Sequence, residues 1–209
     1  MDFDYKLARF KAGEAERITG LSTVMQRDWR RRKLLARPDG HARFDVFGLS
    51  EMMFLKTMAD RGIGPKRASE LAEFAAGGIA FGALLPEAAY DEADPVPSDA
   101  MQRERAASVI RKTTKKKVLK RLLPARYLII WADGTEHWNE NVQSAIESLD
   151  NRQMWEKMSG PIIVIDQWML GLLLIKNAGR PLVHVERRSS EATDSPGEAK
   201  RRTQKVVSR

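Results

Sequence analysis

The stretch from residue 15 to residue 44 constrains the fold of this chain more than any other. It reads AERITGLSTVMQRDWRRRKLLARPDGHARF. A short segment with an apolar face ends at Gly20, where a tight turn is expected. Ser22 can then cap a second helix over about residues 23–32, because its hydroxyl accepts a hydrogen bond from a free backbone N–H of the first turn.

The second helix has an apolar side and a basic side. Met25 and Trp29 lie four residues apart, so they are expected to point inward together, while most other positions carry glutamine or arginine. A short helix, a glycine turn and an arginine-rich second helix form the plan of a helix-turn-helix. In that plan the second helix enters the DNA major groove.

A hairpin is expected directly after this helix. Asp39-Gly40 is a strong signal for a hairpin turn, and Pro38 suits a sheet edge because proline cannot donate to a ladder. Two short strands after a recognition helix make a wing, here about residues 37–43.

These residues together resemble the winged-helix DNA-binding domain of MerR-type transcription regulators. The resemblance rests on the residues Gly20-Leu21-Ser22, Arg27, Trp29, Leu34-Leu35 and Arg43-Phe44. It covers about residues 5–78, and the spacing agrees without a gap as far as Leu35. The chain departs from the family pattern at Lys33, at Ala42 and in the segment 28–30. Excisionases and small phage regulators share the same winged helix.

The resemblance and the helix-turn-helix plan imply a set of DNA contacts on the recognition helix and the wing. The expected contacts are Ser22, Thr23, Gln26, Arg27, Arg30, Arg31, Arg37, His41 and Arg43. The alternative interpretation is a small helical domain with a solvated basic face.

Composition agrees with a polyanionic partner. The chain has 209 residues and a formal net charge of +8, and a basic balance favours nucleic acid. It has no cysteine, which excludes disulfides and thiolate metal sites. The N-terminus lacks the apolar run of a signal peptide, and the most apolar stretch, residues 168–175, is too short to span a bilayer. We therefore expect a cytoplasmic protein with no membrane partner.

The sequence predicts an α+β chain in four parts. Residues 1–80 form the winged-helix domain, with later helices at about 46–61 and 65–76, the second stopped by Gly77-Gly78. Residues 81–100 form an acidic, proline-containing linker, residues 101–186 a small mixed α/β domain for dimerisation or effector binding, and residues 187–209 a basic disordered tail. Predicted N-caps are Asp45, Ser98 and Asp166.

Three apolar runs predict strands in the C-terminal half. They cover residues 127–131, 161–165 and 181–185, and a helix over about 167–178 separates the last two. Strands that flank one helix in this way allow a parallel crossover. A fragment ending near Pro86 is expected to fold alone.

A second basic block lies at residues 111–126. It fits both a phosphate-contacting surface and a solvated helix face, and lysines there would add affinity with little specificity. The expected phosphate contacts are Lys115, Lys116, Lys117 and Lys120.

Catalytic chemistry has little support. The one acid and histidine cluster, Asp133, Glu136, His137 and Glu140, fits a polar surface turn better than a metal site, and motifs for phosphate loops or hydrolases are absent from the sequence. We expect no enzyme, no cofactor and no metal. Four tryptophans fit a core or dimer interface better than a ligand pocket; they are Trp131, Trp138, Trp155 and Trp168.

The resulting hypothesis is a sequence-specific DNA-binding transcription regulator that acts as a homodimer on double-stranded DNA, with RNA polymerase as a further expected contact. The alternative is a phage- or plasmid-related architectural factor of the recombination directionality or partition type. The third hypothesis, a nucleic-acid-processing enzyme, lacks an acidic metal-binding set.

Overall fold

The computed structural model describes residues 3–35, 43–91, 98–115, 117–121 and 125–187. Arg37, His41, Lys116 and nearly all of the expected wing and tail lie outside these residues. The fold is α+β, and the described strands form three small antiparallel sheets.

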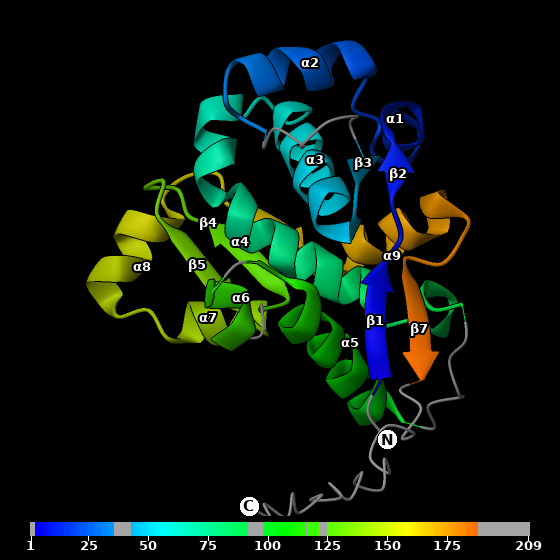
Figure 1. Cartoon of the computed structure of the whole chain (residues 1–209). Coiled ribbons are helices and arrows are strands. Elements are labelled where there is room, and N and C mark those ends of the chain that lie inside the picture. The colour runs from blue at the N-terminus through cyan, green and yellow to red at the C-terminus, as the bar shows by residue number, and fades with distance from the viewer. Residues whose placement is uncertain (1–2, 36–42, 92–97, 116, 122–124, 188–209) are drawn as a thin grey trace, which may run out of the picture.

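The element bounds are as follows (Figure 1). The N-terminal half contains β1 (Phe3–Leu7), β2 (Phe10–Lys11), α1 (Ala12–Thr19), α2 (Thr23–Arg31), β3 (Arg43–Phe44), α3 (Val46–Ala59), α4 (Pro65–Leu84) and the short 3-10 helix η1 (Glu87–Ala89). The C-terminal half contains α5 (Asp99–Thr113), α6 (Lys117–Arg121), β4 (Tyr127–Ile130), β5 (Glu136–Asn139), α7 (Val142–Glu147), α8 (Asn151–Met158), β6 (Ile163–Asp166), α9 (Gln167–Ala178) and β7 (Val183–Arg187).

Short polar side chains begin several of these helices, as the sequence predicts. The carboxylates of Asp45 and Asp166 accept hydrogen bonds from the backbone N–H groups of Gly48 and Met169, both at 3.1 Å. The hydroxyl of Ser98 accepts from the Met101 N–H. Each bond satisfies one of the free donors at a helix start, so these N-cap predictions are confirmed.

The predicted end of α4 is wrong. The helix passes through Gly77-Gly78 and continues to Leu84, into the segment expected to be a linker. Gly78 contributes to a helix contact instead, because a Cβ at that position would collide with the Gln167 side chain of α9. A Cβ on Gly82 would likewise lie 2.5 Å from the Trp168 Cα atom of α9. On the other side, a Cβ on Gly171 would collide with the Ala83 nitrogen and the Ile79 oxygen of α4. Glycine at these positions lets the two backbones touch.

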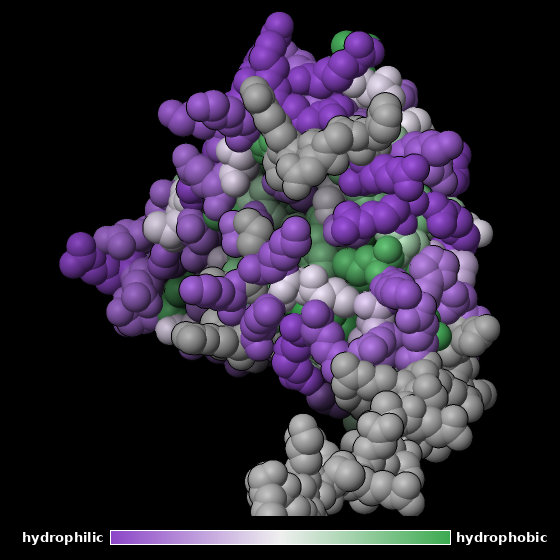
Figure 2. Space-filling model, viewed as in Figure 1, coloured by the Kyte–Doolittle hydropathy of each residue, from purple (hydrophilic) through white to green (hydrophobic). Residues whose placement is uncertain are grey.

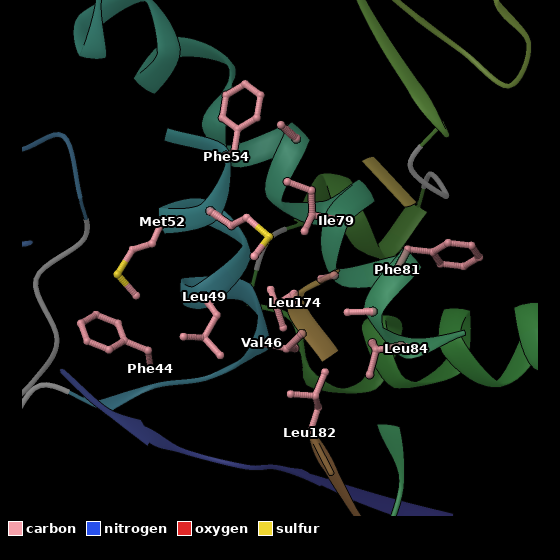
Figure 3. Packing of buried hydrophobic residues seen from close by; sticks show 14 of the residues in the cluster. Phe44, Val46, Leu49, Met52, Phe54, Ile79, Phe81, Leu84, Leu174 and Leu182 are labelled. Atoms are coloured by element: carbon pink, nitrogen blue, oxygen red, sulfur yellow. The ribbon is translucent and has the colours of Figure 1, made fainter. Parts of the chain in front are cut away.

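The hydrophobic core joins the two halves of the chain. Figure 3 shows Val46 and Leu49 of α3, Ile79 and Leu84 of α4 and Leu174 of α9 in one cluster. The cluster also contains buried residues of α1, α2, α5 and β4. Because both sides of the predicted 81–100 boundary contribute to it, we expect a fragment ending near Pro86 to lose much of its core.

The strand pairings differ from the parallel crossover that the sequence allows. In the three-stranded sheet β4 lies between β5 and β6, and both pairings are antiparallel. The last strand, β7, does not join this sheet but pairs with β1 in antiparallel register, with Leu7 opposite Val183. The parallel crossover that the sequence allows is not formed, because β6 and β7 lie in different sheets, and α9 packs along α4 and carries the chain from the three-stranded sheet to β1.

The close helix contact predicts opposite effects for two glycine substitutions. Gly171→Ala should lower the free energy of unfolding by about 1–3 kcal/mol, since the new methyl group meets the α4 backbone. Gly13→Ala is the control, because no atom lies within 4 Å of a Cβ at that position in α1. That variant should be unchanged or more stable by up to about 1 kcal/mol. Chemical denaturation measures both, and equal changes would contradict the close contact.

Candidate nucleic-acid interface

Helix α2 lies on the outside of the molecule, at the top of Figure 1. The turn before it contains Gly20 with a φ of +73°, a left-handed conformation that favours glycine. The Ser22 hydroxyl then accepts a hydrogen bond from the Met25 N–H at 3.2 Å. The predicted turn and cap are both present, and they fix where α2 begins.

The inner face of α2 anchors the helix to α1. Trp29 is buried in the core. Gln26 is completely buried, and its amide nitrogen donates to the backbone oxygens of Ala12 at 3.1 Å and Leu21 at 2.8 Å. Gln26 is therefore not part of the candidate interface, because a DNA base cannot reach a completely buried side chain. The spacing of three residues between Gln26 and Trp29 already indicated a shared inner face.

The outer face of α2 carries Val24, Arg27 and Arg31, which follow helical spacing and are all exposed. Arg31 and its neighbour Arg32 both pair with the carboxylate of Asp28, at 2.7 and 2.9 Å. No ion pair of Arg27 is found with any other described residue. Within the described part of the chain, this face therefore carries one paired arginine, Arg31, and one arginine without an ion pair, Arg27.

Arg30 occupies the border between the two faces. Its Nε donates to the Gln26 backbone oxygen at 2.9 Å, and its guanidinium carbon lies 5.8 Å from the centre of the Phe44 ring. These contacts hold the side chain towards β3. Arg30 is thus half-buried and positioned by the protein before any ligand arrives.

The two short strands β2 and β3 lie next to this helix pair. Phe10 pairs with Phe44, and Lys11 pairs with Arg43, so the exposed Arg43 side chain lies in a basic pair at this edge.

Thr23, another expected DNA contact at the start of α2, is held close to α1 because its backbone N–H donates to the Glu16 carboxylate. Figure 2 shows a mainly hydrophilic surface around α2.

The acidic residue nearest the start of α1 is held in its charged form. The pKa of Glu14 is lowered, first because its carboxylate accepts a hydrogen bond from the Lys11 backbone N–H, at 2.8 Å. Partial burial opposes this effect, and Arg180 adds a further hydrogen bond and a positive charge.

The second basic block lies away from α2. Lys115, Lys117 and Lys120 are exposed, but α6 lies in the lower half of Figure 1 with much of the molecule between it and α2. Two basic residues of the block are already engaged: Arg111 pairs with Glu104, and Arg126 pairs with Asp166. The structure therefore does not bring this block and the α2 face together into one continuous surface.

The acid and histidine cluster does not assemble into a metal site. His137 lies on strand β5, so it does not share a helical face with Glu140, and Glu136 pairs with Arg67 at 2.8 Å. Across the described ranges, no group of three or more potential ligands could hold a metal ion. None of the helices in the described part combines the length and apolar character needed to cross a bilayer.

The tryptophans have different environments. Trp131 is buried, Trp138 packs edge-on against Phe74 with ring centres 4.6 Å apart, and Trp168 packs against Phe81. Trp155 on α8 is 80% exposed. Three of the four tryptophans therefore contribute to packing, and Trp155 does not.

No protein-family model matches the chain, and no curated protein matches its sequence.

The buried amide of Gln26 predicts a structural defect when it is removed. Gln26→Leu should lower the free energy of unfolding by about 1–3 kcal/mol, because the buried hydrogen bond to the Leu21 carbonyl and the half-buried one to the Ala12 carbonyl are both lost. Arg27→Leu, the same replacement at the next position, should change it by less than about 0.5 kcal/mol, since Arg27 is exposed. Thermal and urea unfolding report both values. Equal stability of the two variants would contradict the structural role of the Gln26 amide, and Gln26 would again be a candidate DNA contact.

Proposed function

We propose that this protein is a sequence-specific DNA-binding transcription regulator that places α2 in the major groove. Helices α1 and α2, the glycine turn between them and the expected wing over about residues 37–43, of which the structure describes only Arg43, act in this proposal as a winged helix-turn-helix similar to that of MerR-type regulators. The wing would approach the sugar-phosphate backbone of the DNA through Arg43.

The observation that carries the proposal is the orientation of α2. Trp29 and Gln26 fix one face to the protein, so Arg27 and Arg31 point outward from an outermost helix. An arginine fork fits the two acceptors of guanine in the major groove, and a helix fits the width of that groove.

Binding to a specific sequence should depend on Arg27. We expect Arg27→Ala to weaken binding to duplexes selected from a random library by ~1–3 kcal/mol, with a smaller loss on scrambled DNA. Arg152→Ala is the matched control: it removes the same charge from α8, where Arg152 is exposed and pairs with Glu156. Fluorescence anisotropy at fixed salt gives the affinities.

Three results would change this proposal. An equal loss on selected and scrambled DNA would make Arg27 a phosphate contact. An equal loss for Arg27→Ala and Arg152→Ala would remove α2 from the interface, and no enrichment of any sequence would reject the proposed function. Genomic footprinting then separates two roles, since sites at promoters favour a regulator in contact with RNA polymerase, and sites at recombination junctions favour an architectural factor.

A homodimer is the second part of the proposal, because two copies double the length of DNA that is read. Exposed apolar side chains lie on α9 at Met169, Leu172 and Leu173, with spacing that gives one helix face opposite the buried one. Such residues are typical of interfaces rather than of free surfaces.

The dimer can be tested without deleting the shared core. Light scattering of the full chain should give twice the monomer mass of 23.7 kDa. The double variant Leu172→Glu/Leu173→Glu should give a single monomer mass, while Met101→Glu, at an exposed apolar position on α5, should remain dimeric. A monomeric wild-type protein would reject the dimer. A dimeric double variant would place the interface elsewhere.

A further inference from the structure

One apolar side chain lies on the arginine-rich face of α2. Val24 is 67% exposed, whereas Trp29 on the opposite face is buried. Val24 is neither part of the described hydrophobic core nor packed against it. Valine is also a weaker helix former than alanine or arginine, so helix propensity does not account for its presence.

The position of Val24 places it where a recognition helix contacts base edges. It is the second residue of α2, directly after the Ser22 cap and Thr23. In helix-turn-helix complexes the N-terminal residues of the recognition helix reach the bases. The apolar group on the major-groove edge of the base pairs is the 5-methyl group of thymine.

We propose that Val24 reads the methyl group of a thymine in the bound DNA, an inference that rests on the proposed function of α2. Val24 and Arg27 are three residues apart, which is ~4.5 Å along the helix axis. Base pairs are stacked about 3.4 Å apart. For an α2 that runs along the groove, this spacing places the thymine one or two base pairs from the guanine that Arg27 contacts.

Deoxyuridine tests this contact because it differs from thymidine only by the missing methyl group. Duplexes selected from a random library are resynthesised with single deoxyuridine substitutions at each thymine. We expect the wild-type protein to bind about fourfold more weakly at one such position, which is the effect of one buried methyl group. Val24→Ala should bind the thymidine and deoxyuridine duplexes about equally.

Two further variants serve as controls. Val24→Thr keeps one methyl group on a branched side chain and should retain part of the preference for thymine. Trp155→Ala removes an exposed apolar side chain from α8, away from α2, and should retain all of it.

The possible failures can be told apart. The inference is overturned if the wild-type protein binds thymidine and deoxyuridine duplexes equally at every position. It is also overturned if Val24→Ala keeps the full preference for thymidine. Either result leaves specific DNA binding intact. If no duplex is enriched at all, the proposed function and this inference are both rejected.

Discussion

The structure depends on one close contact, the crossing of α4 and α9. Gly82 and Gly171 allow the two backbones to touch, which brings many dispersion contacts within range at once. Helix α4 also packs against α3, and α3 packs against α1, which supports α2. The direction of the arginine-rich face is thus set through a series of contacts that begins with two residues lacking side chains.

The charges on α2 are arranged so that they can change partners at low cost. Asp28 holds Arg31 and Arg32 in exposed ion pairs, which contribute little stability in water. A phosphate group could replace the carboxylate with a small net loss. Arg30 differs, because its bond to the Gln26 backbone and its place over Phe44 hold it in one geometry. Helix α2 and the residue after it therefore carry one arginine held in place, Arg30, and two that can exchange partners, Arg31 and Arg32.

Local features were predictable from the sequence, and contacts distant along the chain were not. The caps at Asp45 and Asp166 involve backbone groups three residues away, so the pattern of nearby residues determines them. The Gly77-Gly78 pair was misread because glycine serves both helix ends and helix contacts, and the partner helix lies about 90 residues further on. Gln26 was misassigned because its polar character was weighed above its spacing from Trp29.

The pairing of β1 with β7 has a consequence for synthesis. The first described strand hydrogen-bonds to the last, with Tyr5 opposite Val185, so a ribosome must make almost the entire described chain before that ladder can form. Helix α9, which packs against α4, also emerges late. During translation the early helices would expose apolar surface, a condition in which nascent chains associate with chaperones or with each other. The β1–β7 pairing, and the core that α9 completes, can therefore form only once β7 has left the ribosome.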